Sequence, residues 1–183
     1  MSKILKHIDV ELTASSINRA IREIELMKKQ LNEQLLDLVR ELTQEGIEIA
    51  KMQVVALDAI MTGDLEKSIQ GVFFKEEGCG VIYSDVPHAL YVEFGTGIVG
   101  DTTFHDLSGA DGSTHWDYDV RGHGTKGWWY PAPWGWWIPK TGKYKGQPMA
   151  WTQGMPARPF LYNTLRWLQE SAPDKASSMF NQM

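Results

Sequence analysis

Residues 87–97 read Pro-His-Ala-Leu-Tyr-Val-Glu-Phe-Gly-Thr-Gly, and this stretch decides how the rest of the chain is organised. The six residues before Gly95 are mostly apolar and form a short core segment. Gly95 and Gly97 end that segment and give the backbone two positions where a sharp turn carries little steric cost. We therefore expect a buried element that turns abruptly at its C-terminal end.

Two further blocks lie upstream and downstream of this stretch. Residues 62–69 read Thr-Gly-Asp-Leu-Glu-Lys-Ser-Ile, where Gly63 is free to adopt a positive φ and Asp64 can cap the next element. Residues 157–161 read Ala-Arg-Pro-Phe-Leu, and Pro159 suits the first turn of a helix because its missing N–H would have no partner there. Apolar residues then recur at helical spacing, which predicts a C-terminal helix over residues 157–170.

Glu93 stands inside the apolar run, between aromatic neighbours. Such a carboxylate is either a catalytic acid or a structural group that accepts hydrogen bonds from the Gly95–Gly97 turn or from a residue such as Arg158. We favour the structural role. His88, a lone histidine, is interpreted as a surface or subunit-contact residue rather than a base.

Taken in order, the three blocks resemble the tail-completion, or head-to-tail joining, family of long-tailed bacteriophages. The motif residues that carry the resemblance are Thr62, Gly63, Leu65, Ser68, Tyr91, Glu93, Phe94, Gly95, Thr96, Gly97, Arg158, Pro159 and Phe160.

The resemblance implies a non-enzymatic structural protein without a cofactor. It would form a homo-hexameric ring in the virion neck, after assembly in the bacterial host cytoplasm. The implied neighbours are the tail tube or tail terminator on one face and the head connector or head-closure protein on the other. DNA would pass through the ring without sequence-specific binding. A tail terminator, which has a related fold and also forms rings, is the alternative.

The patterning predicts one α+β domain, in which a long N-terminal helix and a C-terminal helix pack on a small, mostly antiparallel sheet. A helix is expected over residues 15–59, capped by Ser15 or Ser16, with Gly46 as a candidate kink. A β-hairpin, Ile69–Lys75 with Gly80–Ser84, begins the section 69–97. Residues 98–155 are an inserted loop, and the tail after residue 170 lacks clear periodicity, as expected of a mobile end or an arm that reaches a neighbour.

The first helix carries a heptad-like seam of apolar residues at alternating four-three spacing, interrupted only by Lys28. Packing on the protein's own sheet and contact with a neighbouring subunit are both open interpretations. The residues of the seam are Ile17, Ile21, Ile24, Leu31, Leu35, Leu38 and Leu42.

The first half of the insertion is polar and glycine-rich. Its histidines, His105, His115 and His123, suggest a metal site, but no metal-binding motif spacing accompanies them. We instead expect its acidic residues to face the channel of the ring and to repel DNA phosphates. These residues are Asp101, Asp106, Asp111, Asp117 and Asp119.

The second half concentrates indoles among prolines. Aromatic clusters of this kind often dominate interfaces, so contact with another subunit or partner is the leading interpretation. A hairpin folded back over the protein's own sheet and a carbohydrate-stacking surface are the alternatives, and the last would indicate a carbohydrate-binding or cell-wall-acting module. The expected interface residues here are Trp128, Trp129, Trp134, Trp136 and Trp137, with Leu31, Leu35 and Leu38 from the seam.

Composition is consistent with a globular protein that assembles in a reducing compartment. The chain has 183 residues, 43% of them apolar, one cysteine and a formal charge of −5. One cysteine excludes an intrachain disulfide, and net acidity argues against tight wrapping of nucleic acid. We find no hydrolase, nucleotide-binding or dinucleotide-binding motif, no signal peptide and no membrane span.

Overall fold

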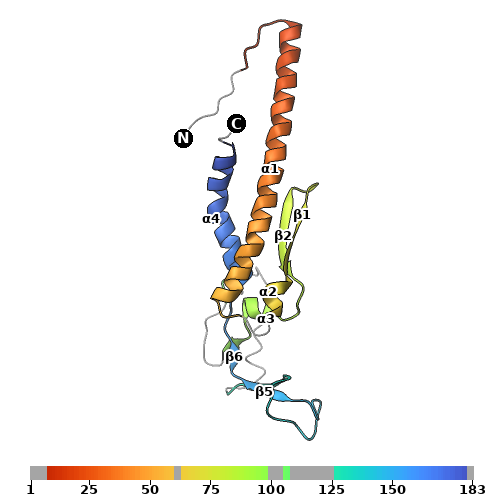
Figure 1. Ribbon diagram of the computed structural model, residues 1–183, viewed down its shortest axis with the longest axis vertical. Coiled ribbons are helices and arrows are strands. Elements are labelled where there is room, and N and C mark those ends of the chain that lie inside the picture. The colour runs from red at the N-terminus through yellow and green to blue at the C-terminus, as the bar shows by residue number, and fades with distance from the viewer. Residues whose placement is uncertain (1–7, 60–62, 99–104, 108–125, 181–183) are drawn as a thin grey trace. The chain divides into compact units, whose positions relative to one another are not determined.

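The computed structural model describes residues 8–59, 63–98, 105–107 and 126–180. It has the α+β architecture predicted from the sequence, with a long N-terminal helix, a C-terminal helix and small two-stranded sheets (Figure 1). The sheets pair β1 with β2, β3 with β6, and β4 with β5. The elements are α1 (Ala14–Ala56), α2 (Asp64–Ser68), β1 (Ile69–Phe74), β2 (Cys79–Ser84), α3 (Ala89–Phe94), β3 (Gly97–Ile98), β4 (Trp128–Pro131), β5 (Met149–Thr152), β6 (Gly154–Met155) and α4 (Phe160–Phe180).

The chain divides into two compact units, each built from segments that are distant in sequence. Unit 1 comprises Met1–Met52, Ile69–Tyr83 and Asn163–Met183, whereas unit 2 comprises Gln53–Ser68 and Ser84–Tyr162. Both α1 and α4 therefore contribute residues to both units. That these units together form one domain stays a prediction.

Helix α1 begins earlier than expected and runs without interruption. Thr13, not Ser15 or Ser16, supplies the N-terminal cap, because its Oγ1 accepts a hydrogen bond from the Ser16 N–H at 3.2 Å. The helix continues through Gly46, the candidate kink. A side chain at Gly46 would collide with Ile82 of β2 and come within 2.9 Å of Leu168 of α4, so this glycine allows the three elements of unit 1 to pack closely.

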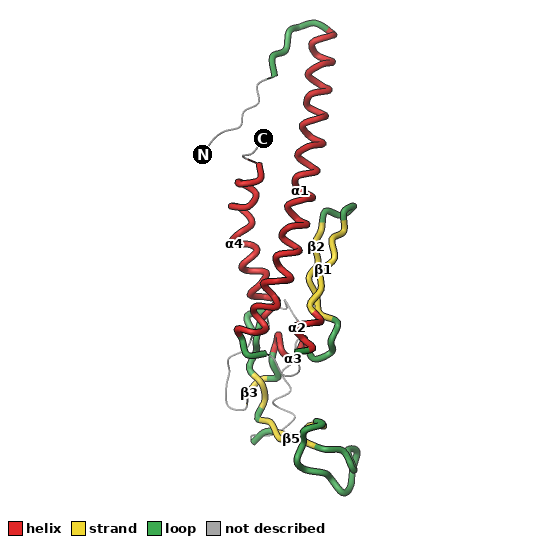
Figure 2. The backbone as a smooth tube through the Cα atoms, viewed as in Figure 1, coloured by secondary structure: helices red, strands yellow, loops and turns green. Residues whose placement is uncertain are grey.

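The β1–β2 hairpin forms as predicted, one residue shorter at the end of β1 and one longer at the start of β2. One of its faces lies on α1, where the glycines Gly71 and Gly80 meet Thr43 and Ile47 (Figure 2). Successive residues along β1 alternate between covered and exposed, which is the expected pattern of a strand with one packed face.

Helix α4 extends ten residues beyond the predicted end at residue 170. The tail that was expected to be mobile or to act as an arm is helical as far as Phe180, although Pro173 supplies no N–H to the helix. Lys175 on this extension forms an ion pair with Glu45 of α1 at 2.9 Å. Pro159 directly precedes the helix rather than occupying its first turn.

Candidate functional site

The two motif blocks around residues 87–97 and 157–161 are joined by main-chain hydrogen bonds. The Arg158 N–H donates to the Val92 carbonyl at 2.8 Å, and the Thr96 N–H donates to the Met155 carbonyl at 2.9 Å. Thr96 also accepts, through Oγ1, a hydrogen bond from the Met155 N–H at 2.8 Å. Strands β3 and β6 continue this pairing in antiparallel register. Segments about sixty residues apart therefore form one structural unit at the base of the insertion.

Glu93 lies at the centre of this junction and is buried. Its Oε2 accepts a hydrogen bond from the Leu161 N–H and its Oε1 one from the Tyr162 N–H, each at 2.9 Å. These are first-turn N–H groups of α4, which have no carbonyl partner within the helix. A carboxylate also interacts favourably with the positive end of the helix dipole. Glu93 thus has a structural role, as expected, but it caps the N terminus of α4. The expected partners were the Gly95–Gly97 turn and Arg158.

His105 completes the cluster, which we call the Glu93 node: Glu93, His105 and the first turn of α4. The Leu107 N–H donates to His105 Nδ1 at 3.0 Å, so in the neutral ring the proton resides on Nε2. Nε2 lies 3.3 Å from Glu93 Oε1 and donates to it. The imidazole is fully enclosed, with Phe94 and Tyr162 ring centroids at 4.6 and 5.2 Å.

The sequence grouped His105 with histidines that could bind a metal, and its role in the Glu93 node was missed. No local pattern marks a histidine that will meet a carboxylate twelve residues earlier. In the part of the chain that the structure describes, no group of three or more histidine, cysteine or carboxylate side chains could hold a metal ion.

Gly95 is the C-terminal cap of α3, with φ 73° and ψ 175°. A Cβ atom there would lie 2.6 Å from the Ala157 nitrogen and 2.7 Å from the Met155 oxygen. Positive φ and close backbone approach both require glycine at this position. Gly97 and Gly63, at φ 75° and 79°, also adopt the left-handed region, as predicted.

The insertion contains a second, different cluster on the Trp hairpin, which we define as residues 128–152. Trp129 and Trp151 stand opposite each other in the β4–β5 register, and Trp137 bridges to Met149 on the same sheet. The Trp129 ring packs against Trp136, Trp137 and Trp151, with centroid distances of 4.7, 4.9 and 5.3 Å. Offset and edge-on pairs at these distances are favourable.

The indoles around Trp129 remain substantially exposed. The exposed fractions are 53% for Trp134, 75% for Trp136, 42% for Trp137 and 42% for Trp151, whereas Trp128 and Trp129 are half-buried. The segment thus forms a hairpin with an exposed aromatic surface, and both packing on the protein's own sheet and contact with a partner stay predictions.

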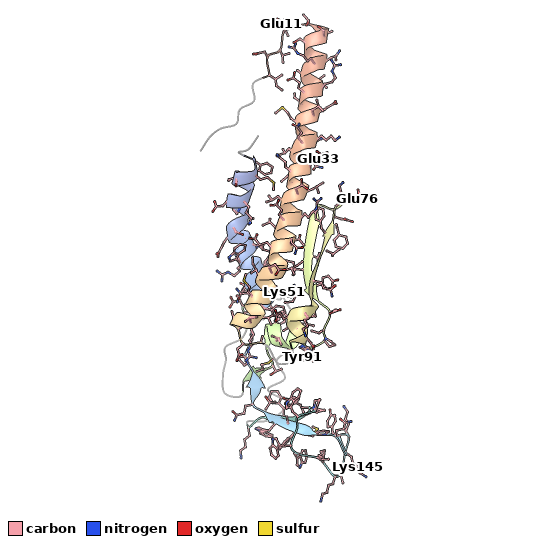
Figure 3. The ribbon with its side chains drawn as sticks, viewed as in Figure 1. Glu11, Glu33, Lys51, Glu76, Tyr91 and Lys145 are labelled. Carbon is pink, nitrogen blue, oxygen red and sulfur yellow. The ribbon has the colours of Figure 1, made fainter. Side chains whose placement is uncertain are left out.

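Sequence reasoning overlooked the charge of this region. Between residues 126 and 158 the chain has no acidic residue, although the whole chain carries a formal charge of −5. Most of the basic groups lie on the loop between the two strands, where Lys143 Nζ is 5.2 Å from the Tyr144 ring centroid. Figure 3 shows Lys145 at the far end of that loop. The basic residues are Lys126, Lys140, Lys143, Lys145 and Arg158.

The remaining predicted residues are exposed, buried, or outside the described parts of the chain. Leu31 and Leu35 are exposed on α1, but Leu38 is buried within its own unit and therefore belongs to the core. Leu65 and Ser68 are buried in α2. Asp106 is exposed. Residues outside the described parts of the chain are Thr62, Asp101, Asp111, Asp117 and Asp119.

Ser68, the last residue of α2, is hydrogen-bonded to residues before and after it in the chain. Its hydroxyl donates to the Leu65 carbonyl at 2.7 Å and lies 2.7 Å from the Ser84 hydroxyl. Tyr91 and His88 are exposed on and before α3. The motif residues that the structure describes are thus mostly structural, because they build turns, caps and helix junctions.

No described helix is both long and apolar enough to cross a bilayer. Comparisons of the chain with protein-family models, curated proteins and solved structures gave no significant match. The resemblance to tail-completion proteins therefore rests on the motif residues themselves.

Proposed function

We propose that the chain is a non-enzymatic virion protein that forms a ring at the head–tail junction of a long-tailed bacteriophage. The ring joins the tail tube to the head connector and allows DNA to pass. The copy number of six and the neck location come from the resemblance of the motif blocks to the tail-completion family.

One observation carries this proposal: two of the three motif blocks that resemble the family, 87–97 and 157–161, meet in the fold. Arg158 bonds Val92, and Glu93 caps the helix that begins after Arg158. A shared structural role for the two blocks supports reading them together as one motif rather than as separate short matches. The motif residues then have the role of a scaffold, which is a role that a ring subunit needs.

Exposed apolar surface gives a second line of support. The N-terminal part of the α1 seam, which includes Ile17, Ile24 and Leu31, is 42–56% exposed, and the Trp hairpin adds its own exposed indoles. A ring subunit must present two different surfaces, one for each neighbour, because head-to-tail contacts close into a ring only when the two surfaces are complementary. The chain exposes apolar side chains in at least these two places.

A tail terminator would use the same surfaces and differs only in its neighbours. A carbohydrate-binding module is the candidate from another class, because exposed indole faces such as that of Trp136 also suit sugar rings. Glycan binding by the purified chain, abolished by Trp136→Ala, would favour that module.

The test is to observe the full chain by electron microscopy, alone at increasing concentration and within particles of the phage that encodes it. We expect closed rings in solution and density for the chain between head and tail. Its immediate neighbours in the particle then separate a tail-completion protein from a terminator. A chain that remains monomeric and is absent from the neck would refute the proposal.

A further inference from the structure

The exposed face of the Trp hairpin is too large to be explained as scattered surface apolar residues. A whole indole side chain has about 250 Å² of surface, so the exposed fractions of the four outer indoles correspond to roughly 500 Å². The largest apolar patch on a typical monomer has about this area, and such a patch is often a binding site. The exposed indoles therefore mark the hairpin as a candidate docking surface.

The charge of the hairpin indicates the chemistry of the partner that would dock there. Residues 126–158 carry five basic side chains and no acidic one, so the rest of the chain has an excess of acidic residues larger than the net charge of −5. Opposite charge steers association and disfavours wrong partners. A second copy of this chain is an anionic partner that is always present at the same concentration.

A complementary face exists on the β1–β2 hairpin. The alternation of the strands places Val72 and Phe74 on the side away from α1, and Val81 and Tyr83 on the same side of the neighbouring strand. These four side chains are 38–44% exposed. Aromatic and β-branched side chains in this arrangement form a flat apolar surface suited to indole rings.

The turn of the β1–β2 hairpin carries two adjacent acidic residues, which follow Lys75. Glu76 and Glu77 occupy the turn between the strands, and Figure 3 shows Glu76 at the tip of the hairpin. One hairpin thus combines an apolar face with an acidic tip, and the other an indole face with a basic tip.

We infer that the Trp hairpin of one copy docks on the outer face of the β1–β2 hairpin of the next copy. The indoles cover Val72, Phe74 and their neighbours, and the lysine loop meets Glu76 and Glu77. This inference rests on the proposed ring and names the contact that builds it. Each copy offers one hairpin of each kind, so the contact is head-to-tail and can repeat until the ring closes.

DNA and anionic lipid would also attract the lysines. Neither accounts for the matching apolar face on the same chain, and for that reason a second copy is favoured. Binding of the hairpin to either polyanion becomes an outcome of the experiment.

Cys79 provides a direct test, because it is the chain's one cysteine and it is exposed on the outer face of β2. We would introduce Lys143→Cys and oxidise the full-length protein at a concentration where it associates. Two cysteines on complementary surfaces should link copies into a ladder of dimers, trimers and larger species on a non-reducing gel. The unaltered chain, with Cys79 alone, cannot exceed a dimer.

Two matched controls accompany the cross-link. Glu33→Cys places a second cysteine on an exposed position of α1, outside the proposed contact, and should give no ladder. Lys143→Cys combined with Cys79→Ser should also give none beyond a dimer. If Lys143→Cys links copies no better than Glu33→Cys, the inference is wrong.

Charge reversal tests the same contact without oxidation. The pair Lys143→Glu and Lys145→Glu, and separately the pair Glu76→Lys and Glu77→Lys, should each weaken self-association about tenfold in sedimentation velocity. Mixing the two variants should restore it, because the reversed loop of one variant then meets the reversed tip of the other. Unchanged association, or no recovery on mixing, would contradict the contact.

The outcomes separate this inference from the proposed function. Rings that persist without cross-linking and without sensitivity to charge reversal would refute the hairpin contact but leave the ring proposal standing. A cross-linked ladder from a chain absent from the neck would refute the function and leave the contact. Loss of DNA or vesicle binding in Lys143→Glu, Lys145→Glu with self-association intact would assign the hairpin to a polyanion and refute the contact.

Discussion

The Glu93 node and the Trp hairpin belong to the same unit, but the node buries its most distinctive side chains and the hairpin exposes them. In the node, Glu93 and His105 are buried, and every hydrogen bond described for them is made within unit 2. In the hairpin, the indoles gather around Trp129 yet leave roughly 500 Å² exposed. One cluster is satisfied by its own chain, and the other is not.

This difference separates the motif blocks from the inserted segment. The motif blocks 87–97 and 157–161 lie in and around the satisfied cluster, where they determine how α4 is joined to α3. The exposed cluster lies in the inserted segment, outside the motif blocks. If the proposed contact is correct, stability and partner binding depend on different residues, and substitutions should separate the two properties.

The largest loss of stability is expected for Glu93→Ala. The substitution removes the carboxylate that accepts from the partly buried Leu161 and Tyr162 N–H groups and from the buried His105 Nε2. Leaving a buried donor unsatisfied costs about 1–3 kcal/mol, so we expect the free energy of unfolding to fall by about 3–5 kcal/mol. Urea denaturation monitored by circular dichroism measures this change.

Glu33→Ala is the matched control, since Glu33 is an exposed carboxylate on α1 (Figure 3). Its removal should change the free energy of unfolding by no more than about 0.5 kcal/mol. If Glu93→Ala were as mild as Glu33→Ala, the node would not be a stabilising centre and the contrast with the hairpin would disappear.

Gly95→Ala should be the next most harmful change. Gly95 combines positive φ with a backbone approach of 2.6 Å to the position of an added Cβ. Gly142, on the loop of the Trp hairpin, also has positive φ, at 86°, but an added Cβ would meet no atom within 4 Å. We expect a loss of about 3 kcal/mol at Gly95 and about 1 kcal/mol at Gly142.

The same denaturation experiment compares the two glycine variants. Their difference isolates the cost of close packing from the cost of backbone strain. Equal losses would mean that the junction beside Gly95 opens easily, and the node would then be less rigid than its hydrogen bonds suggest.

Features with a local cause could be predicted from the sequence. The seam of α1, the β1–β2 hairpin and the positive φ of Gly63, Gly95 and Gly97 arise from periodicity and from the steric freedom of glycine. The position of the helix cap was missed by two residues because Thr13 and two serines were all plausible caps.

Features that depend on distant partners could not be predicted. Glu93 bonds residues 68 and 69 positions away, so a local interpretation placed its hydrogen bonds at the nearest turn. The extension of α4 has no clear apolar periodicity, and its ion pair to Glu45 joins segments that are far apart in the sequence. The charge of the Trp hairpin was visible in the sequence but was obscured by the more conspicuous tryptophans.

Within the Trp hairpin, the smallest effect on stability is expected at the most exposed indole. Trp136 is 75% exposed, so Trp136→Ala should lower the free energy of unfolding by about 1 kcal/mol or less. Trp129 touches three other indoles, and Trp129→Ala should cost about 2 kcal/mol because the cluster loses its centre.

Self-association, measured by sedimentation velocity, should respond differently from stability. Trp136→Ala should weaken self-association strongly in a protein that remains folded, since exposed aromatic anchors contribute to binding more than to folding. A Trp136→Ala variant that unfolds, or one that associates like the unaltered chain, would show that this indole serves the hairpin's own packing. The hairpin, like the Glu93 node, would then be a cluster whose contacts lie within its own chain.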